Sequence, residues 1–304
     1  MAARILVIRG GAIGDFILTL PAIRLIREAF PTAHLEILGY KHILSLAKGR
    51  YYANDTRSIE YAPLARCFAR NAEVDPELAE YFAGFQQVVS YLFDPDGIFA
   101  AQLTRCGVKN LLTGSPKLTD DHHATYQLAR PLESLALFLE DPAARVYPTA
   151  EDRAAVESRL PREPFWVIHP GSGSARKNWP VRHWLELADW LEKRTAQPLV
   201  IVGGESDQAT LGAFAPTSRR IILDSLPLPH LAAALERSAG FFGHDSGISH
   251  LAAATEARCL LLFGPTNPAV WAPKNAGVTV LRSEDLSQLE PPVVQEAAER
   301  VFRL

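Results

Sequence analysis

Short apolar runs alternate with helical stretches along most of the chain. Two of these runs, RILVIR at Arg4–Arg9 and FWVI at Phe165–Ile168, each lead into a polar turn containing glycine and then into a helical pattern. Further runs of the same kind are Leu35–Leu38, Val88–Leu92, Leu199–Val202, Ile221–Leu223, Gly240–Gly243 and Leu260–Phe263. Strands that alternate with helices in this way predict parallel βαβ units, and therefore an α/β fold.

The strand–turn–helix opening occurs twice, which predicts two Rossmann-like, doubly wound domains. We place the boundary near Tyr147-Pro148, so that residues 1–148 form one domain and residues 149–290 the other. The last segment, residues 291–304, has the pattern of an amphipathic helix. Ligands of open α/β sheets bind at the carboxyl ends of the strands, so we expect loops from both domains to line a shared cleft.

Composition narrows the class of protein without selecting a function. The chain has 304 residues, of which 48% are hydrophobic, enough for two α/β domains. A net charge of −3 argues against nucleic-acid binding and gives no electrostatic attraction to an anionic membrane. The three scattered cysteines predict a reducing compartment, and no segment resembles a signal peptide or membrane span. We expect a cytoplasmic monomer, with at most peripheral contact at the inner face of the cytoplasmic membrane.

The stretch Gly240–Asn275 carries the strongest functional signal. It predicts a strand, a turn at His244-Asp245-Ser246-Gly247, a helix of small residues and a second strand. Such a turn directs free backbone N–H groups and the positive end of a helix to the carboxyl edge of a sheet, which favours an anionic ligand. Asp245 or Ser246 as a simple N-cap explains the turn equally well. His250 favours the binding site, because its ring can reach back over the helix start.

The loop after the first strand contains Gly10, Gly11, Gly14 and Asp15. Its glycines allow a ligand to approach the backbone closely, but the G-x-G-x-x-G spacing of a dinucleotide site is missing. Asp15 is either an acid of the first helical turn that complements the helix dipole, or a carboxylate directed at a ligand. In the second role it would be an ionised and weak general base.

The loop at Gly171–Lys177 combines glycines, hydroxyls and cations directly after a strand. Its small residues let backbone N–H groups surround phosphate oxygens, while Arg176 and Lys177 add positive charge. It is not a Walker A loop, because the glycine spacing differs and no serine or threonine follows Lys177. A basic surface turn is the alternative, and we favour a phosphate-binding loop.

Three other acidic segments are weaker candidates. Glu205, in the turn after Leu199–Val202, is placed to bind ribose hydroxyls, although a solvated turn acid is a similar alternative. Asp94-Pro95-Asp96-Gly97 has the form of a metal–nucleotide motif but also that of an ordinary turn. Four consecutive residues such as Asp120-Asp121-His122-His123 cannot all face one ion unless the loop folds around it. We therefore predict no metal site.

Taken together, these loops resemble the ADP-heptose:lipopolysaccharide heptosyltransferases, glycosyltransferase family 9. The matching pieces occur in the family's order and cover both halves: IRGGAIGDFILTLPAIRLIREAFP, HPGSGSARKNWP, VGGES and GHDSGISHLAAATEARCLLLFGPTNPAVWAP. The resemblance implies a GT-B fold with the acceptor site on the first domain and the nucleotide-sugar site on the second. It also implies that residues 291–304 cross back to the first domain. Gly10-Gly11-Ala12 departs from the family, which more often has a bulkier residue and serines there.

The resemblance assigns roles to individual residues. Asp15 corresponds to the proposed base, with Gly10, Gly11 and Gly14 as the loop on the acceptor side, and Lys177 to the lysine that binds phosphate. The remaining residues of the implied donor site are Ser172, Gly173, Ser174, Glu205, Asp245, Ser246, Gly247, His250 and Thr266.

The implied reaction is a single inverting displacement that needs no metal or other cofactor. Asp15 would accept a proton from an acceptor hydroxyl as it attacks the anomeric carbon of an ADP-heptose or similar ADP-sugar. The acceptor would be lipopolysaccharide core or another glycan, and Lys177 with the Ser172–Ser174 backbone would stabilise the leaving diphosphate. Three alternatives remain: a nucleotide-sugar 2-epimerase, an NAD-dependent dehydrogenase, and a non-catalytic nucleotide-sugar-binding protein. The last would be expected to lack Asp15 or Lys177.

Overall fold

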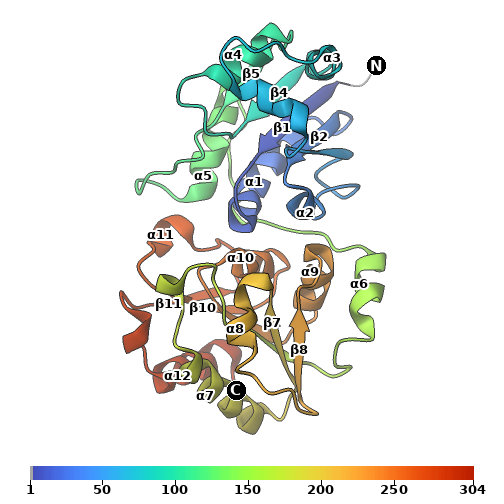
Figure 1. Cartoon of the computed structure of the whole chain (residues 1–304). Helices are drawn as coiled ribbons and strands as arrows, with labels where there is room; N and C mark the ends of the chain where they lie inside the picture. Colours follow the sequence, from blue (N-terminus) through green and yellow to red (C-terminus); the bar gives the residue numbers. More distant parts are fainter. Residues whose placement is uncertain (1–2) are drawn as a thin grey trace. The chain divides into compact units, whose positions relative to one another are not determined.

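The computed structural model describes residues 3–304, which form two compact units that meet between Pro142 and Ala143 in the sequence (Figure 1). The boundary falls six residues before the predicted one. The segment before Pro148 is bound to the second unit: Val146 N–H donates to the Ala254 carbonyl, and Asn275 Nδ2 donates to the Ala144 carbonyl. Ala143, Ala144 and Val146 are also buried. A sequence pattern alone does not reveal such contacts to a distant helix and loop.

The first unit is built on a parallel sheet with strand order β3-β2-β1-β4-β5. Its strands are β1 Arg4–Arg9, β2 His34–Gly39, β3 Asp55–Ser58, β4 Gln87–Ser90 and β5 Leu111–Thr113. Its helices are α1 Ile13–Ala29, α2 Lys41–Leu44, η1 Ala62–Phe68, α3 Pro76–Ala83, α4 Ile98–Arg105, α5 Ala124–Ala129 and η2 Arg130–Leu135. Successive residues of β1 point to opposite faces, and Leu6 and Ile8 pack in one core with residues of η1, α3 and α4.

The second unit is built on a parallel sheet with strand order β11-β10-β9-β6-β7-β8. Its strands are β6 Trp166–His169, β7 Leu199–Gly203, β8 Arg220–Asp224, β9 Gly240–His244, β10 Cys259–Phe263 and β11 Val278–Arg282. Its helices are α6 Ala150–Glu157, η3 Ala175–Lys177, α7 Val181–Thr195, η4 Glu205–Asp207, α8 Gln208–Leu211, α9 Leu228–Glu236, α10 Gly247–Ala254, α11 Pro268–Trp271, η5 Leu286–Gln288 and α12 Pro291–Phe302. The central strands are buried along their whole length, as expected for a parallel sheet covered on both faces.

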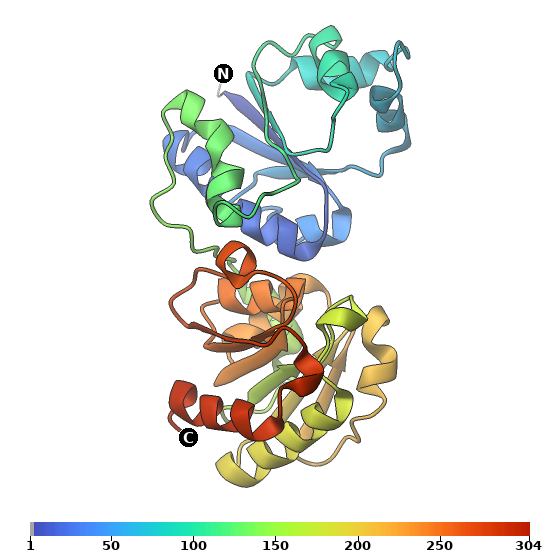
Figure 2. The ribbon, with the colours of Figure 1, turned by 90° about the vertical axis from the view of Figure 1, so that its left-hand side faces the viewer.

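The C-terminal helix packs within the second unit, and the crossing back to the first unit that the family resemblance implies stays a prediction. Helix α12 runs beside α7 (Figures 1 and 2). Val294, Ala298 and Phe302 enter the same apolar core as Trp184 and Leu187 of α7. The amphipathic pattern of α12 is therefore satisfied by the sheet of its own unit.

Three strands escaped the sequence analysis, and all lie at sheet edges. β3 has the sequence DTRS, which is polar throughout, and β5 has only three residues. β11 lies at the edge of the second sheet and is largely half-exposed. Edge strands bury fewer side chains, so their hydrophobic signal is weak. Among the described residues, no helix combines the length and apolar character needed to cross a membrane.

Candidate functional site

The strand order of the second unit brings four predicted loops to one edge of its sheet. These loops follow β10, β9, β6 and β7, which are consecutive neighbours in the sheet. All of these strands are parallel, so their carboxyl ends lie on the same side. The order also reverses at β6, because the chain runs through β7 and β8 on one side of β6 and then returns to β9 on its other side. Such a reversal is where open α/β sheets bind ligands.

Lys177 and Asp245, predicted from loops 68 residues apart, form a direct ion pair. Lys177 Nζ lies 2.6 Å from Asp245 Oδ2. The Asp245 side chain is 8% exposed, and that of Lys177 is 32% exposed. A short bond between charged groups at a partly buried position holds the ammonium in a fixed place. The pair therefore fixes the position of the Lys177 ammonium, whose charge the Asp245 carboxylate balances, at the carboxyl edge of the sheet.

The loop Gly171–Lys177 is shaped by glycines and by internal hydrogen bonds. Ser172 Oγ lies 2.9 Å from the Ser174 carbonyl oxygen and 2.5 Å from Asn178 Oδ1. Gly173 has a φ of +69°, a conformation that favours glycine. A side chain at Gly171 would collide with the Asp207 carboxylate, because its Cβ would lie 1.8 Å from Oδ1. The Ser172 hydroxyl thus holds the loop together.

His244, to which the sequence analysis assigned no role of its own, contacts Gly171 at the start of this loop and Trp179 just after its end. Its Nε2 accepts a hydrogen bond from Trp179 N–H at 2.7 Å and lies 3.3 Å from Trp184 Nε1. Its Nδ1 lies 3.3 Å from the Gly171 carbonyl oxygen, to which it donates in the neutral tautomer that these partners require. Complete burial lowers the pKa of His244 to about 3. A neutral imidazole therefore ties the loop to the end of β9.

The acid that the fold buries in the turn after β7 is Asp207 rather than Glu205. Asp207 Oδ2 accepts a hydrogen bond from Gly204 N–H at 3.0 Å and lies 3.4 Å from His169 Nε2. The hydrogen bond with His169 lowers the pKa of Asp207. Glu205 is exposed at the start of the same turn, which leaves its carboxylate accessible to a ligand. Asp207 thus supports the turn from within, whereas Glu205 is exposed on its surface.

The turn after β9 caps helix α10, as the N-cap alternative predicted. Ser246 Oγ accepts a hydrogen bond from Ser249 N–H at 3.2 Å and lies 3.4 Å from His169 Nδ1. Gly247 is the first residue of α10, and His250 is buried in its first turns. The cap is compatible with ligand binding, because other N–H groups of the helix start have no partner within the helix.

Thr266 follows β10 in the loop Gly264-Pro265-Thr266. Its Oγ1 is buried and has no hydrogen-bond partner among residues 3–304. A Cβ built on Gly264 would lie 3.7 Å from the Arg176 carbonyl oxygen, so this loop adjoins the loop of Lys177. Buried hydroxyls are usually hydrogen-bonded, so a ligand oxygen or a water molecule is the expected partner of Thr266 Oγ1.

In the first unit, Asp15 lies at the N-terminus of α1 and has two partners. Its Oδ2 accepts a hydrogen bond from Ala12 N–H at 2.9 Å, and its Oδ1 lies 3.5 Å from Arg9 Nη2. Arg9 is buried at the end of β1, where its Nε also donates to Thr19 Oγ1 at 2.9 Å. Burial lowers the pKa of Arg9, and Asp15 opposes this effect. The Asp15 side chain remains 34% exposed, so it is both oriented and accessible.

Asp15 also lines a pocket of about 520 Å³ at the carboxyl ends of β1 to β4. Gly10, Gly11 and Arg9 form its wall on the side of β1. Tyr40, Phe68 and Phe93 contribute aromatic rings, and each is more than a third exposed. Gly14 lies in the first turn of α1. The sequence predicted the loop and its acid, but not Arg9 or the aromatic wall, because these residues come from separate strands and turns.

The two acidic motifs set aside in the sequence have structural roles. Asp94 accepts hydrogen bonds from Phe99 N–H and Ala100 N–H at 3.0 and 2.9 Å, and so holds the start of α4. His123 is the N-cap of α5. Within residues 3–304, no group of three or more histidines, cysteines or acids is arranged to hold a metal ion.

Comparison with known proteins gives a family and a fold. The model of glycosyltransferase family 9 (heptosyltransferase) matches residues 123–299, more than half of the chain. Lipopolysaccharide heptosyltransferase 1 of Pseudomonas aeruginosa is 26% identical over an alignment 298 residues long. The alignment covers 87% of this chain and 79% of that protein.

Solved structures agree in fold at lower sequence identity. The glycosyl transferase family 9 structure from Veillonella parvula has a TM-score of 0.83 and 19% identity, covering 99% of this chain and 97% of its own. E. coli heptosyltransferase WaaC with ADP has a TM-score of 0.73 and 18% identity, covering 98% and 99%. These likenesses identify the fold as GT-B-like and confirm that prediction.

Proposed function

We propose a donor and a mechanism for this chain, which belongs to glycosyltransferase family 9 (heptosyltransferase). The chain is a glycosyltransferase, as the sequence predicted. Its donor is ADP-heptose or a related ADP-sugar, and its acceptor is a hydroxyl of lipopolysaccharide core or another glycan. The similar WaaC structure contains ADP, which supports an ADP-sugar as the donor.

The observation that carries this proposal is the ion pair of Lys177 and Asp245 at the switch point of the second sheet. The ends of three adjacent strands, β10, β9 and β6, supply a fixed ammonium, a glycine-rich loop, a helix start and the Thr266 hydroxyl, which has no partner among the described residues. These are donors suited to diphosphate oxygens. The exposed Glu205, at the end of β7, suits ribose hydroxyls.

The mechanism is a single displacement with inversion at the anomeric carbon. Asp15 accepts the proton of the acceptor hydroxyl while the hydroxyl oxygen forms the new glycosidic bond. The bond between the anomeric carbon and the diphosphate oxygen breaks, and the diphosphate leaves as an anion stabilised by Lys177 and the surrounding N–H groups. Fixed donors of this kind supply a large part of the rate enhancement in many enzymes. The Asp245 carboxylate accepts a hydrogen bond from a sugar hydroxyl, and His250 holds sugar or phosphate oxygens.

Ligand-induced thermal stabilisation tests the donor site. ADP should raise the melting temperature of the second unit by mass action, and GDP and UDP should do so less. Lys177→Ala should reduce the shift strongly and Lys177→Arg only partly, because arginine retains the charge but not the geometry. Lys193→Ala, an exposed position near the end of α7, is the matched control. No shift with any of the three nucleotides would refute this donor site.

An activity assay with ADP-heptose tests the reaction type and the absence of a metal requirement. Transfer should persist in EDTA, and Asp96→Asn should remain active because the donors proposed here are side chains and N–H groups. Activity that is lost on chelation and restored by Mg²⁺ or Mn²⁺ would overturn this part of the proposal. Conversion of a nucleotide sugar to its 2-epimer would instead support the epimerase alternative.

A further inference from the structure

We propose that His169 is a positioning residue of the donor site, which joins the turn of Glu205 to the turn of Asp245. Its imidazole fixes the separation between the groups that bind the ribose and those that bind the diphosphate of the donor. This inference rests on the proposed function, because it concerns how the proposed donor site is held in shape. The sequence analysis assigned no role to His169.

The place of His169 in the sheet lets it reach both turns. It is the last residue of β6, the strand that lies between β7 and β9 in the second sheet. The turn of Glu205 follows β7, and the turn of Asp245 follows β9. His169 is only 3% exposed, so it is placed to support these turns and not to bind a ligand directly.

One ring nitrogen of His169 holds the turn after β7 through Asp207. His169 Nε2 lies 3.4 Å from Asp207 Oδ2, which also accepts a hydrogen bond from Gly204 N–H at 3.0 Å. The hydrogen bond with His169 lowers the pKa of Asp207, so the carboxylate is ionised at neutral pH and Nε2 is the donor. Glu205 lies between Gly204 and Asp207, and the bond between these two residues therefore fixes its turn.

The other ring nitrogen of His169 holds the turn after β9 through Ser246. Nδ1 lies 3.4 Å from Ser246 Oγ. When the proton of the neutral ring is on Nε2, Nδ1 is the acceptor and the Ser246 hydroxyl donates. Ser246 Oγ also accepts the bond from Ser249 N–H that caps α10. Ser246 directly follows Asp245, the partner of Lys177, so His169 supports both the helix start and this ion pair.

The contacts of His169 differ from those of the other supports. The ion pair of Lys177 and Asp245 links the loop after β6 to the turn after β9, and His244 links the end of β9 to the same loop. His169 links the turns on the two sides of its own strand. Loss of one ring contact should therefore weaken one part of donor binding and spare the other. A residue that only stabilises the fold would affect both parts equally.

Two amide side chains separate the contacts of His169. An asparagine amide reaches the position of Nδ1 and a glutamine amide that of Nε2, and either amide can donate and accept. His169→Asn should therefore keep the contact with Ser246 and lose that with Asp207. His169→Gln should do the reverse, and His169→Ala should lose both contacts.

Calorimetric titration with ADP, dideoxy-ADP (which lacks both ribose hydroxyls) and AMP measures the two parts of binding. The Kd of dideoxy-ADP divided by that of ADP gives a ribose ratio, and the Kd of AMP divided by that of ADP gives a phosphate ratio. His169→Asn should lower the ribose ratio about fivefold, the scale of one hydrogen bond, and keep the phosphate ratio. His169→Gln should lower the phosphate ratio and keep the ribose ratio.

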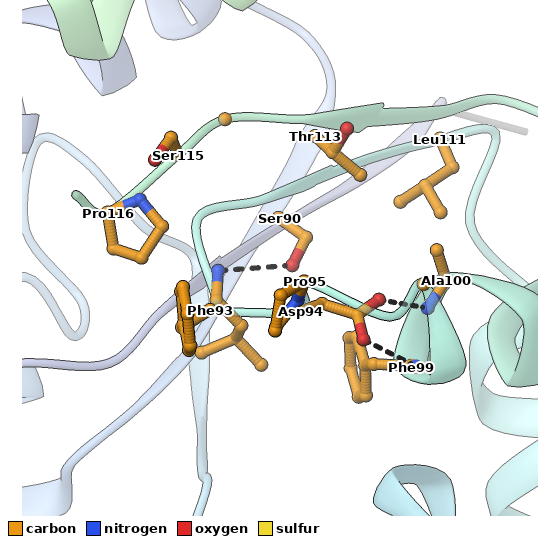
Figure 3. A pocket seen from close by; sticks show the side chains of 13 residues that line it. Ser90, Phe93, Asp94, Pro95, Phe99, Ala100, Leu111, Thr113, Ser115 and Pro116 are labelled. Carbon is orange, nitrogen blue, oxygen red and sulfur yellow. Dashed lines mark hydrogen bonds between the residues drawn. The ribbon is translucent and has the colours of Figure 1, made fainter. Parts of the chain in front are cut away.

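Two substitutions serve as controls and should keep both ratios. His230→Asn replaces a partly exposed histidine of α9. Asp94→Asn weakens the support of a helix start in the first unit, where the carboxylate accepts N–H bonds from Phe99 and Ala100 (Figure 3). Equal changes of the two ratios in both His169→Asn and His169→Gln would overturn the inference. So would unchanged ratios in both variants.

NMR of nitrogen-15-labelled histidine rings tests the contacts of His169 without a ligand. The ring signals that disappear in His169→Gln identify this residue, and they should show a proton on Nε2. A ring proton on Nδ1 with none on Nε2 would overturn the inference. Failure of ADP to bind the wild type would instead count against the proposed donor site, and the ring signals would still decide whether His169 donates to Asp207.

Discussion

At the scale of single residues, Arg9 is one of the two groups that orient the Asp15 carboxylate. The ion pair with Arg9 and the bond from Ala12 N–H fix the carboxylate while leaving it accessible. We expect Asp15→Asn to lower kcat by about 10²–10⁴-fold, the usual contribution of a general base, because the amide cannot accept the proton. The melting-temperature shift with ADP should persist, since Asp15 is not among the donor loops. Steady-state kinetics and thermal shift on the same preparation measure both.

Asp121→Asn, an exposed acid of the same unit, is the matched control for this substitution. If Asp15→Asn removed ADP binding and kept turnover near normal at saturating donor, Asp15 would be a structural residue of the helix start. The enzyme would then lack an identified base.

His244 is the residue whose protonation should matter most for the second unit. Its pKa is about 3 in the folded chain and about 6.5 as an ordinary histidine, so between these values the unfolded state binds a proton that the folded state does not. The free energy of unfolding should therefore fall as pH decreases below about 6.5, by up to about 1.4 kcal/mol per pH unit from this group. His244→Gln should make this dependence shallower.

Urea unfolding followed by tryptophan fluorescence measures this effect. All five tryptophans of the chain lie in the second unit, so the signal reports on that unit alone. His122→Gln, at an exposed position, should keep the wild-type slope between pH 7 and pH 5. Parallel curves for His244→Gln and the wild type would show that His244 does not contribute to the pH dependence.

At the scale of elements, the turn between β1 and α1 depends on a glycine. Gly11 has a φ of +96°, and a Cβ there would lie 2.7 Å from Asp15 Oδ2. Gly11→Ala should therefore displace the carboxylate and reduce kcat by about 10²-fold, as small misplacements of catalytic groups do.

Gly49→Ala separates this effect from backbone strain alone. Gly49 also has a positive φ, +64°, but a Cβ there meets no atom within 4 Å. The Gly49→Ala variant should have a slightly lower melting temperature than the wild type and a kcat near the wild-type value. Equal losses of kcat in the two variants would mean that the loss comes from strain and not from contact with Asp15.

At the scale of the whole molecule, each unit has its own sheet and its own apolar core. The supports of the proposed donor loops, His244, Asp207 and His169, all belong to the second unit. We therefore expect residues 143–304 alone to fold, to bind ADP like the full chain, and to transfer no sugar. Calorimetric titration of the fragment measures this, with Lys177→Ala in the fragment as the control. A folded fragment without ADP affinity would show that the donor site needs the first unit.

Much of the architecture followed from the order of residues alone. The runs that became β1, β6, β7 and β10 are apolar because both faces of a parallel sheet are covered, and that pattern is local. The edge strands β3, which is polar throughout, and β5, which has only three residues, carry too little hydrophobic signal to be found this way. β11, with the sequence VTVLR, was also missed although it starts with alternating apolar and polar residues. Lys177 and Asp245 were predicted from separate motifs, and their 2.6 Å contact follows from the adjacency of β6 and β9.

The sequence by itself determined the α/β class, the two repeated openings and the loops that carry Asp15, Lys177 and Asp245. Tertiary structure alone decided which residues support them. Arg9, Asp207 and His244 look like ordinary strand or turn residues, and their roles arise from partners up to 73 residues away. The attachment of Ala143–Val146 and of α12 to the second unit is likewise set by packing. A local sequence pattern shows which side chains of a strand or helix are buried. The residues that those side chains contact depend on which distant strands the sheet places next to each other.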